Sequence, residues 1–258
     1  MIQIVFMRSI LLACIGISSL FANSKEIILN MGEVGSSYPP YFIFDEGKPS
    51  GIMFDVLFFI AKKSDYTVSV THLPKNRVAG LLKAGKVNAT GQAPEWTKEA
   101  NQFEFTDVVM EIRDVIFSHI DNPHSFSTFD EMIGKTAITH LGYHYPIFDV
   151  YFDNNQIKRY DTVDERAMLG MVMKKRGDFT IINELVAKRT LAKYNWIKSF
   201  KMAKIHSKNI GYRFMFSKEW RHFVKFFNKE LIKMKKNGTL RKIVEKYVSE
   251  ESSDYSYF

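Results

Sequence analysis

The residues best suited to chemistry in this sequence are histidines and carboxylates, and they form no recognisable catalytic motif. His140 and His144 are four residues apart, but Gly142 between them is expected to end a strand, so the pair lacks the helical spacing of a metal site. His144 and Glu184 are the best candidates for an acid and a base. The sequence holds no nucleophile elbow and no phosphate loop. We therefore expect a binding site with no catalytic residue, no metal and no cofactor.

Two basic residues stand where a predicted strand turns into a helix. Arg77, in "HLPKNRVAG", lies where free backbone N–H groups and the helix dipole favour an anion. The alternative is a surface arginine at a helix start. Lys75, two residues earlier, is expected to be solvated.

Aromatic residues follow other predicted strands. Trp96 lies in the loop "APEWTKEANQ", and Tyr143 and Tyr145 flank His144 after the glycine that ends a strand. Such rings stack on flat or apolar parts of a ligand, and with nearby glutamates they can enclose a cation. The alternative for each ring is ordinary packing.

The elements that must position these residues alternate between strand and helix. Hydrophobic patterning predicts strands at 26–34, 66–73 and 86–93, with helices at 50–64 and 76–85. This order favours a largely parallel sheet with helices on its faces.

A second series begins later in the chain. It has a strand at 134–142 and a helix at 163–177, with capping-box spacing at Thr128 and Glu131 and at Thr162 and Glu165. Two similar lobes, each presenting its strand ends to a shared cleft, explain the repetition.

Seven segments carry a family resemblance: "YPPYFIFDEGKPSGIMFDVLFFIAKK", "LLKAGKVNA", "FEFTDVV", "FDEMIGKTAITHLGYHY", "RGDFTIINELVA", "NIGYRFMFSK" and "FNKELIKMKKNGTLRKIVEKYV". In this order they resemble the bacterial extracellular solute-binding proteins of family 3. The resemblance implies an α/β, two-lobed periplasmic-binding-protein-like fold of type II, with two hinge crossings and a ligand cleft between the lobes.

The resemblance also implies where the chain changes lobe, near residues 118–123 and again near 205–209. The expected organisation is a signal peptide at 1–22, lobe one at 23–118 plus 209–248, lobe two at 119–208, and a flexible tail at 249–258.

The resemblance implies three site positions as well. Tyr38 matches a position whose ring covers the ligand. In amino acid binders of the family, an arginine six residues before the position of Phe105 grips the α-carboxylate, and an aspartate at the position of Asn183 binds the α-ammonium. Here the arginine position holds Glu99, which would repel a carboxylate. The alternative is that Glu99 lies on the surface. The expected ligand-binding residues are Tyr38, Arg77, Gln92, Trp96, Glu99, Tyr143, His144 and Asn183.

The first residues predict export. Arg8 precedes an apolar run at 10–21 that is too short to span a membrane and ends in small residues near Ala22. Lipid attachment at Cys14 is the weaker alternative, because only five uncharged residues separate it from Arg8. We therefore expect a periplasmic monomer with a cleaved signal peptide.

The formal net charge of +8 does not by itself indicate nucleic acid. The lysines are densest at 223–248, where they alternate with apolar residues at helical spacing, which is typical of a solvated helix face. The function that we expect is capture of a small polar solute, amino-acid-like or another metabolite but not a standard α-amino acid, by hinge closure for ABC-type uptake. The alternatives are a sensory receptor for a membrane signalling partner and, less favoured, a dehydratase-type enzyme on the same fold.

Overall fold

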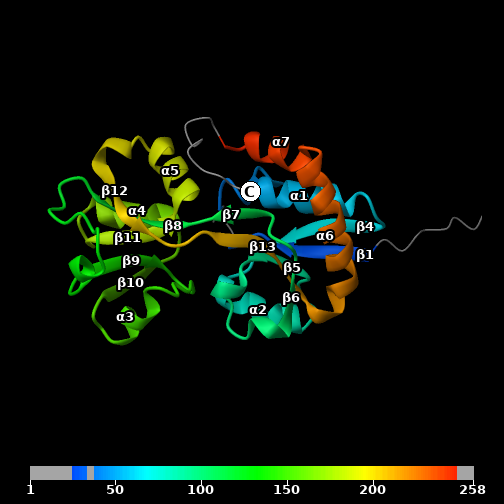
Figure 1. Ribbon diagram of the computed structural model, residues 1–258, viewed down its shortest axis with the longest axis horizontal. Helices are drawn as coiled ribbons and strands as arrows, with labels where there is room; N and C mark the ends of the chain where they lie inside the picture. Colours follow the sequence, from blue (N-terminus) through cyan, green and yellow to red (C-terminus); the bar gives the residue numbers. More distant parts are fainter. Residues whose placement is uncertain (1–24, 34–37, 249–258) are drawn as a thin grey trace, which may run out of the picture.

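The chain folds into two α/β lobes that lie end to end along the longest axis of the molecule (Figure 1). This computed structural model describes residues 25–33 and 38–248. The predicted signal peptide and the predicted tail lie outside the described residues. The expected two-lobed α/β fold is confirmed, because each lobe has its own mixed sheet.

The sheet of lobe one has the order β4-β1-β5-β13-β6, and β7 pairs with β13. Strands β1, β4 and β5 are parallel, as the alternating pattern predicted. The late strand β13 lies antiparallel beside β5, so the sheet is mixed. The strands are β1 (Lys25–Asn30), β4 (Tyr66–Thr71), β5 (Ala89–Gln92), β6 (Phe103–Phe105), β7 (Met110–Ile112) and β13 (Ile210–Ser217), with a separate hairpin of β2 (Ile43–Asp45) and β3 (Lys48–Ser50).

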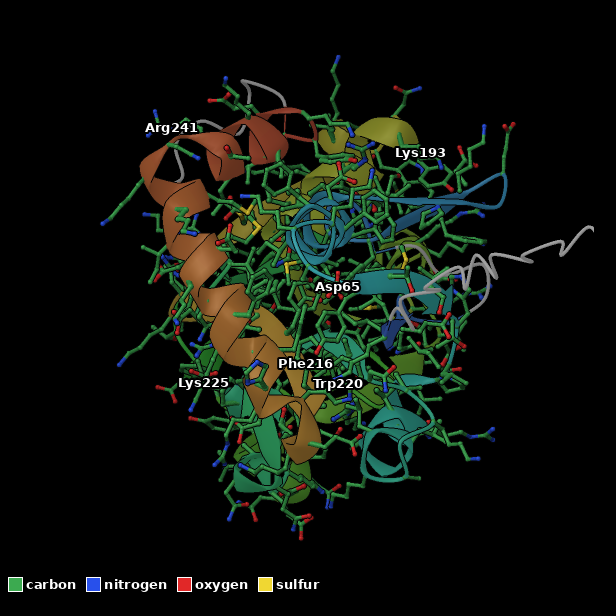
Figure 2. The ribbon with its side chains drawn as sticks, turned by 90° about the vertical axis from the view of Figure 1, so that its right-hand side faces the viewer. Asp65, Lys193, Phe216, Trp220, Lys225 and Arg241 are labelled. Atoms are coloured by element: carbon green, nitrogen blue, oxygen red, sulfur yellow. The ribbon has the colours of Figure 1, made fainter. Side chains whose placement is uncertain are left out.

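Helices cover both faces of this sheet (Figure 1). On one face lie α1 (Ile52–Ala61), α6 (Arg221–Lys236) and α7 (Thr239–Glu245), and on the other lies α2 (Lys75–Lys83). Helix α6 buries Phe223 and Phe227 against the sheet, while its lysines stay exposed, as Figure 2 shows for Lys225. The interpretation of the lysine-rich segment as a solvated helix face is therefore confirmed.

Lobe two repeats the plan with the order β10-β9-β11-β8-β12. Strands β9, β10 and β11 are parallel, and β8 and β12 are antiparallel to their neighbours. Helices α4 and α5 pack in one core cluster, and α3 packs at the other. The bounds are β8 (Asp114–His119), β9 (Thr136–His140), β10 (Lys158–Thr162), β11 (Phe179–Asn183), β12 (Phe200–His206), α3 (Asp149–Asp153), α4 (Glu165–Met173) and α5 (Glu184–Lys193).

The first crossing between the lobes comes earlier than predicted. Strand β7 ends at Ile112 in the first sheet and β8 begins at Asp114 in the second, so the chain changes lobe at Arg113 and not at 118–123. The reason is that β8 pairs on both sides, with β11 and with β12. The second crossing lies at 207–209, between β12 and β13.

Neither predicted capping box forms. Helix α4 is capped by Asp164, whose carboxylate accepts a hydrogen bond from the Ala167 N–H at 2.6 Å. Thr162 belongs to β10, where it pairs with β9. Around Thr128 there is only a short 3₁₀ segment, and the Glu131 carboxylate accepts instead from the Ser127 N–H at 2.9 Å.

The cap of α4 gives a stability prediction. Asp164→Ala should lower the free energy of unfolding by about 1 kcal/mol, because it leaves an N–H of the first helical turn without its acceptor. Thr162→Val, which keeps the β-branched shape and removes only the hydroxyl, should lower it by less than about 0.5 kcal/mol. Urea denaturation followed by circular dichroism measures both, and a larger loss for Thr162→Val would contradict the observed cap.

Candidate ligand-binding cleft

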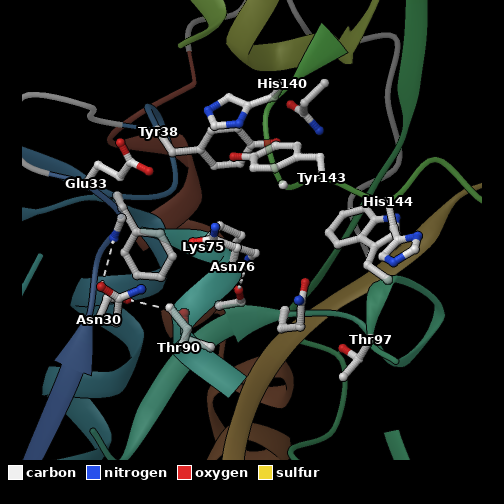
Figure 3. Close-up of a pocket in the computed structure, with 18 of the residues that line it drawn as sticks. Asn30, Glu33, Tyr38, Lys75, Asn76, Thr90, Thr97, His140, Tyr143 and His144 are labelled. Carbon is white, nitrogen blue, oxygen red and sulfur yellow. Dashed lines mark hydrogen bonds between the residues drawn. The ribbon is translucent and has the colours of Figure 1, made fainter. Parts of the chain in front are cut away.

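A cavity of about 390 Å³ lies between the lobes. Lobe one contributes the carboxyl ends of β1 and β5 and the start of α2, through residues such as Asn30, Gln92 and Lys75. Lobe two contributes the loop after β9 and the end of β11. Figure 3 shows Asn30, Thr90 and Lys75 at one side of this cavity and His140 with Tyr143 at another. Ligands of open α/β sheets bind outside the carboxyl ends of the strands, so this is the candidate site.

Six of the eight predicted ligand-binding residues line the cavity, and two do not. Those that do are Tyr38, Gln92, Trp96, Tyr143, His144 and Asn183. The residues that the structure places outside the lining are Arg77 and Glu99, the two whose charge the sequence interpretation relied on most.

Aromatic rings from both lobes meet at the cavity. The Tyr143 ring stacks on His140 with ring centroids 3.9 Å apart, and the Tyr38 ring stacks on Tyr41 at 5.3 Å. The ring centroids of Trp96 and Tyr212 are 6.1 Å apart. Burial raises the pKa of Tyr38 and of Tyr143 well above the usual value, so both present neutral hydroxyls.

The expectation that Glu99 faces the cleft is wrong. Its side chain is 62% exposed, and its carboxylate pairs with the Lys83 ammonium at 3.0 Å on the surface of lobe one. The backbone of Glu99 has a positive φ of 53°, which turns the chain at this point. The neighbouring Lys98 lines the cavity instead. Glu99 therefore exerts no direct repulsion on a ligand carboxylate in the cavity.

At the start of α2, the basic residue that lines the cavity is Lys75 and not Arg77. Arg77 is exposed, while Lys75 is partly buried and lines the cavity. The Lys75 ammonium donates a hydrogen bond to the Gly91 carbonyl at 3.2 Å, and burial lowers its pKa to about 8. Lys75 shares the inward stripe of α2 with Val78 and Leu82, three and seven residues later. That spacing is the sequence signal that identifies it.

Asn183 lies at the cleft, but its side-chain oxygen is fully engaged. Its Oδ1 atom accepts hydrogen bonds from the N–H groups of Leu185 at 3.1 Å and Val186 at 3.3 Å, so it caps α5. The same atom accepts from the Tyr41 hydroxyl of lobe one at 2.9 Å. Its Nδ2 atom donates to the Arg113 carbonyl at 3.3 Å.

Three carboxylates at the cavity, those of Glu33, Asp114 and Glu165, were missed by the sequence analysis. Asp114 begins β8, and burial raises the pKa of its carboxyl to about 6. Glu165 is buried at the start of α4, burial raises its pKa, and it accepts a hydrogen bond from the Tyr143 hydroxyl at 3.4 Å. Asp114 was missed because its strand was assigned to lobe one, and Glu165 because it was interpreted as part of a capping box.

The acid and base pair considered from the sequence does not form. His144 Nδ1 lies 2.9 Å from Asp149, while Glu184 lies outside the cavity lining and pairs with Arg113 at 2.6 Å and Lys188 at 2.8 Å. In the described ranges, no group of three or more histidine, cysteine or acidic side chains is arranged to hold a metal ion. None of the helices there is long and apolar enough to cross a membrane.

Comparisons with known proteins agree with this geometry. Residues 30–250 match the family described as bacterial extracellular solute-binding proteins, family 3. The chain is 26% identical over 257 residues to the probable amino-acid-binding protein YxeM of Bacillus subtilis (strain 168). This alignment covers 94% of this chain and 92% of the relative.

Solved structures share the fold. A mutant of ArgBP from T. maritima superposes with a TM-score of 0.75 at 20% identity, covering 87% of this chain and 96% of that one. A histidine kinase sensor domain with similarity to periplasmic binding proteins superposes with a TM-score of 0.74 at 18% identity. The match covers 88% of this chain and 98% of the sensor domain. The substrate-binding protein of an amino acid ABC transporter superposes with a TM-score of 0.72 at 21% identity. The match covers 87% of this chain and 100% of that one.

The family match spans most of the sequence, and the solved structures share the two-lobed fold. The chain belongs to family 3 of the bacterial extracellular solute-binding proteins, a family of binding proteins and not of enzymes.

Proposed function

We propose that this protein captures a small polar solute between its lobes, by hinge closure, and delivers it to an ABC-type importer. The observation that carries the proposal is that one cavity is lined by opposite charges from opposite lobes, Lys75 from lobe one and Asp114 from lobe two. A ligand that contacts both favours the closed arrangement, which is the condition for ligand-driven closure.

The size of the cavity supports a metabolite-sized ligand. Ligand pockets are usually between about 300 and 1,000 Å³, and this one, at about 390 Å³, lies at the lower end. Asparagine, glutamine and threonine side chains at the strand ends, such as Asn30, Gln92 and Thr90, supply neutral hydrogen-bonding groups. A compact, polar solute fits this lining best.

The anionic part of the ligand is proposed to bind at Lys75. In the described part of the chain its ammonium makes no ion pair, and its hydrogen bond goes to a backbone carbonyl. The ammonium is charged at neutral pH, because the lowered pKa is still about 8. Lysine offers a point charge and not the bidentate fork of an arginine, so an α-carboxylate loses one of its usual contacts.

The proposal that standard α-amino acids are poor ligands now has a different basis. It no longer involves Glu99, which lies on the surface. It rests on the absence of an arginine from the cavity lining that the structure describes, and on Asn183, whose Oδ1 atom already accepts hydrogen bonds from α5 and from Tyr41. The protein YxeM, named as a probable amino-acid-binding protein, keeps amino-acid-like solutes among the candidates.

A sensory role is the second candidate. The fold similarity to a histidine kinase sensor domain is the observation that favours it. In that role the closed form would contact a separate membrane partner. Uptake of the labelled ligand by cells, lost on deletion of the gene and restored by its return, supports import, whereas unchanged uptake with altered gene expression supports sensing.

Closure gives the first functional prediction. Native mass spectrometry of protein purified from the periplasm should identify a retained small solute, and adding that solute to stripped protein should lower the radius of gyration in small-angle X-ray scattering. The reason is that contacts to both lobes stabilise the closed form. An unchanged radius at saturating solute would contradict hinge closure.

Lys75 gives the second prediction. Lys75→Gln should weaken binding of the retained solute at least about tenfold, because the anionic group loses a partly desolvated counter-charge. Lys83→Gln, on the same helix but paired with Glu99 on the surface, is the matched control and should change the affinity less than about twofold. Isothermal titration calorimetry measures both. Equal losses in the two variants would remove Lys75 from the site.

Export gives the third prediction. The mature protein should begin near residue 23, because the small residues near Ala22 follow an apolar run of signal-peptide length. Amino-terminal sequencing of protein from the periplasmic fraction tests this. A chain that begins at Cys14 and carries lipid would show a membrane-attached form instead.

A further inference from the structure

Asp114 holds an unusual place in the cleft. It is the first residue of β8, directly after the crossing at Arg113, and it lines the cavity. Strand β8 pairs antiparallel with β11, and in this register Asp114 stands directly opposite Asn183. Directly opposed residues of an antiparallel pair place their side chains on the same face of the sheet. Asp114 therefore presents a carboxylate beside the position where the family resemblance implies an aspartate.

Asn183 cannot serve in that role here. Its Oδ1 accepts three hydrogen bonds, two from the first turn of α5 and one from Tyr41, and its Nδ2 donates to Arg113. An amide oxygen has two lone pairs, so no acceptor capacity is left for a ligand. The side chain at position 183 fixes α5 and connects the lobes.

The Asp114 carboxylate, in contrast, is free to receive a ligand. The backbone N–H of Asp114 is held by the Ser207 hydroxyl at 2.8 Å, but within residues 25–33 and 38–248 its carboxylate makes no hydrogen bond and no ion pair. A partly buried carboxylate without a partner costs free energy in the ligand-free protein. A cationic ligand group would supply the missing partner.

The surroundings suit an organic cation. Asp114 and Glu165 both act electrostatically on Tyr38 and Tyr143, so the two carboxylates lie near the same pair of rings. Faces of aromatic rings and carboxylates together stabilise ammonium groups. A metal ion is served less well, because the described residues offer no group of three metal-binding side chains.

We propose that Asp114, and not residue 183, binds an ammonium group of the ligand, with Glu165 and the rings of Tyr38 and Tyr143 completing the site. This inference rests on the proposed solute capture and deepens it, because it assigns the ligand to the small organic ammonium compounds. Lys75, on the opposite lobe, then contacts an anionic group of the same ligand.

The test uses matched probes that differ only in the ammonium group. A thermal-shift screen of the mature protein compares 4-aminobutanoate with 4-hydroxybutanoate, putrescine with 1,4-butanediol and ethanolamine with ethylene glycol, and adds the common amino acids. At least one ammonium compound should raise the midpoint temperature of thermal unfolding, and its hydroxyl counterpart should not. The absence of a shift with every ammonium compound would overturn the inference, as would an equal shift with the hydroxyl counterpart.

Variants then assign the residue. For the ammonium compound that binds, Asp114→Asn should raise Kd about 30-fold or more, since loss of a buried charge partner has effects of this size. Asp121→Asn, which removes an exposed carboxylate paired with Lys175 on lobe two, is the matched control and should change Kd less than about twofold. Asn183→Asp should not tighten binding. A tighter Asn183→Asp variant, or an Asp114→Asn variant within threefold of the wild type, would overturn the assignment.

Two further readouts separate the possible failures. The ligand-free Asp114→Asn variant should melt no lower than the wild type, because it loses a desolvated charge, so weak binding cannot be attributed to misfolding. If scattering shows compaction only with a solute that lacks an ammonium group, the proposed function stands and this inference fails. If no solute compacts the protein, the proposed function itself fails.

Discussion

The two passages of the chain between the lobes are joined by reciprocal hydrogen bonds between Asp114 and Ser207. The Asp114 N–H donates to the Ser207 hydroxyl at 2.8 Å, and the Ser207 N–H donates to the Asp114 carbonyl at 2.9 Å. Next to this pair, the Arg113 carbonyl accepts from the Glu184 N–H at 3.1 Å and from Asn183, which sets where α5 begins. The two crossings and the lobe-two side of the site are thus parts of one hydrogen-bonded unit beside Asp114.

The sequence predicted the alternation of strands and helices well, because each element has the hydrophobic period of its own type. It failed at β8. The alternating apolar residues Val115 and Phe117 fit a strand in either lobe, and what decides its place is pairing with β11 and β12, whose residues lie far away in the sequence. Local patterns carry no information about such non-local pairing, so the predicted lobe boundary was several residues too late.

At the site, the sequence predicted the position of several residues along the chain but not the direction in which their side chains point. The glycine that ends a predicted strand located Tyr143 at the cleft, and the family resemblance located Tyr38 and Asn183 there. Counting residues back from Phe105 found the family's arginine position, but not the left-handed turn at Glu99 that accompanies its surface placement. The direction of a side chain depends on backbone angles and on helical phase, and phase was available only for Lys75, through its stripe with Val78 and Leu82.

Charge pairing distinguishes the carboxylates that hold the fold from those available to a ligand. Burial alone would raise the pKa of Glu184, but hydrogen bonds from Arg113 and Lys188 hold it below its usual value, which marks a carboxylate stabilised within the protein. For Asp114, burial raises the pKa without any such compensation. Lys75 shows the converse, since burial lowers its pKa. Two desolvated charges of opposite sign lie on opposite lobes, and neither makes an ion pair within the part of the chain that the structure describes, so they weaken the ligand-free state. The free energy recovered when one ligand contacts both is available only with the lobes together, so the same desolvation that opposes stability would favour closure around the correct solute.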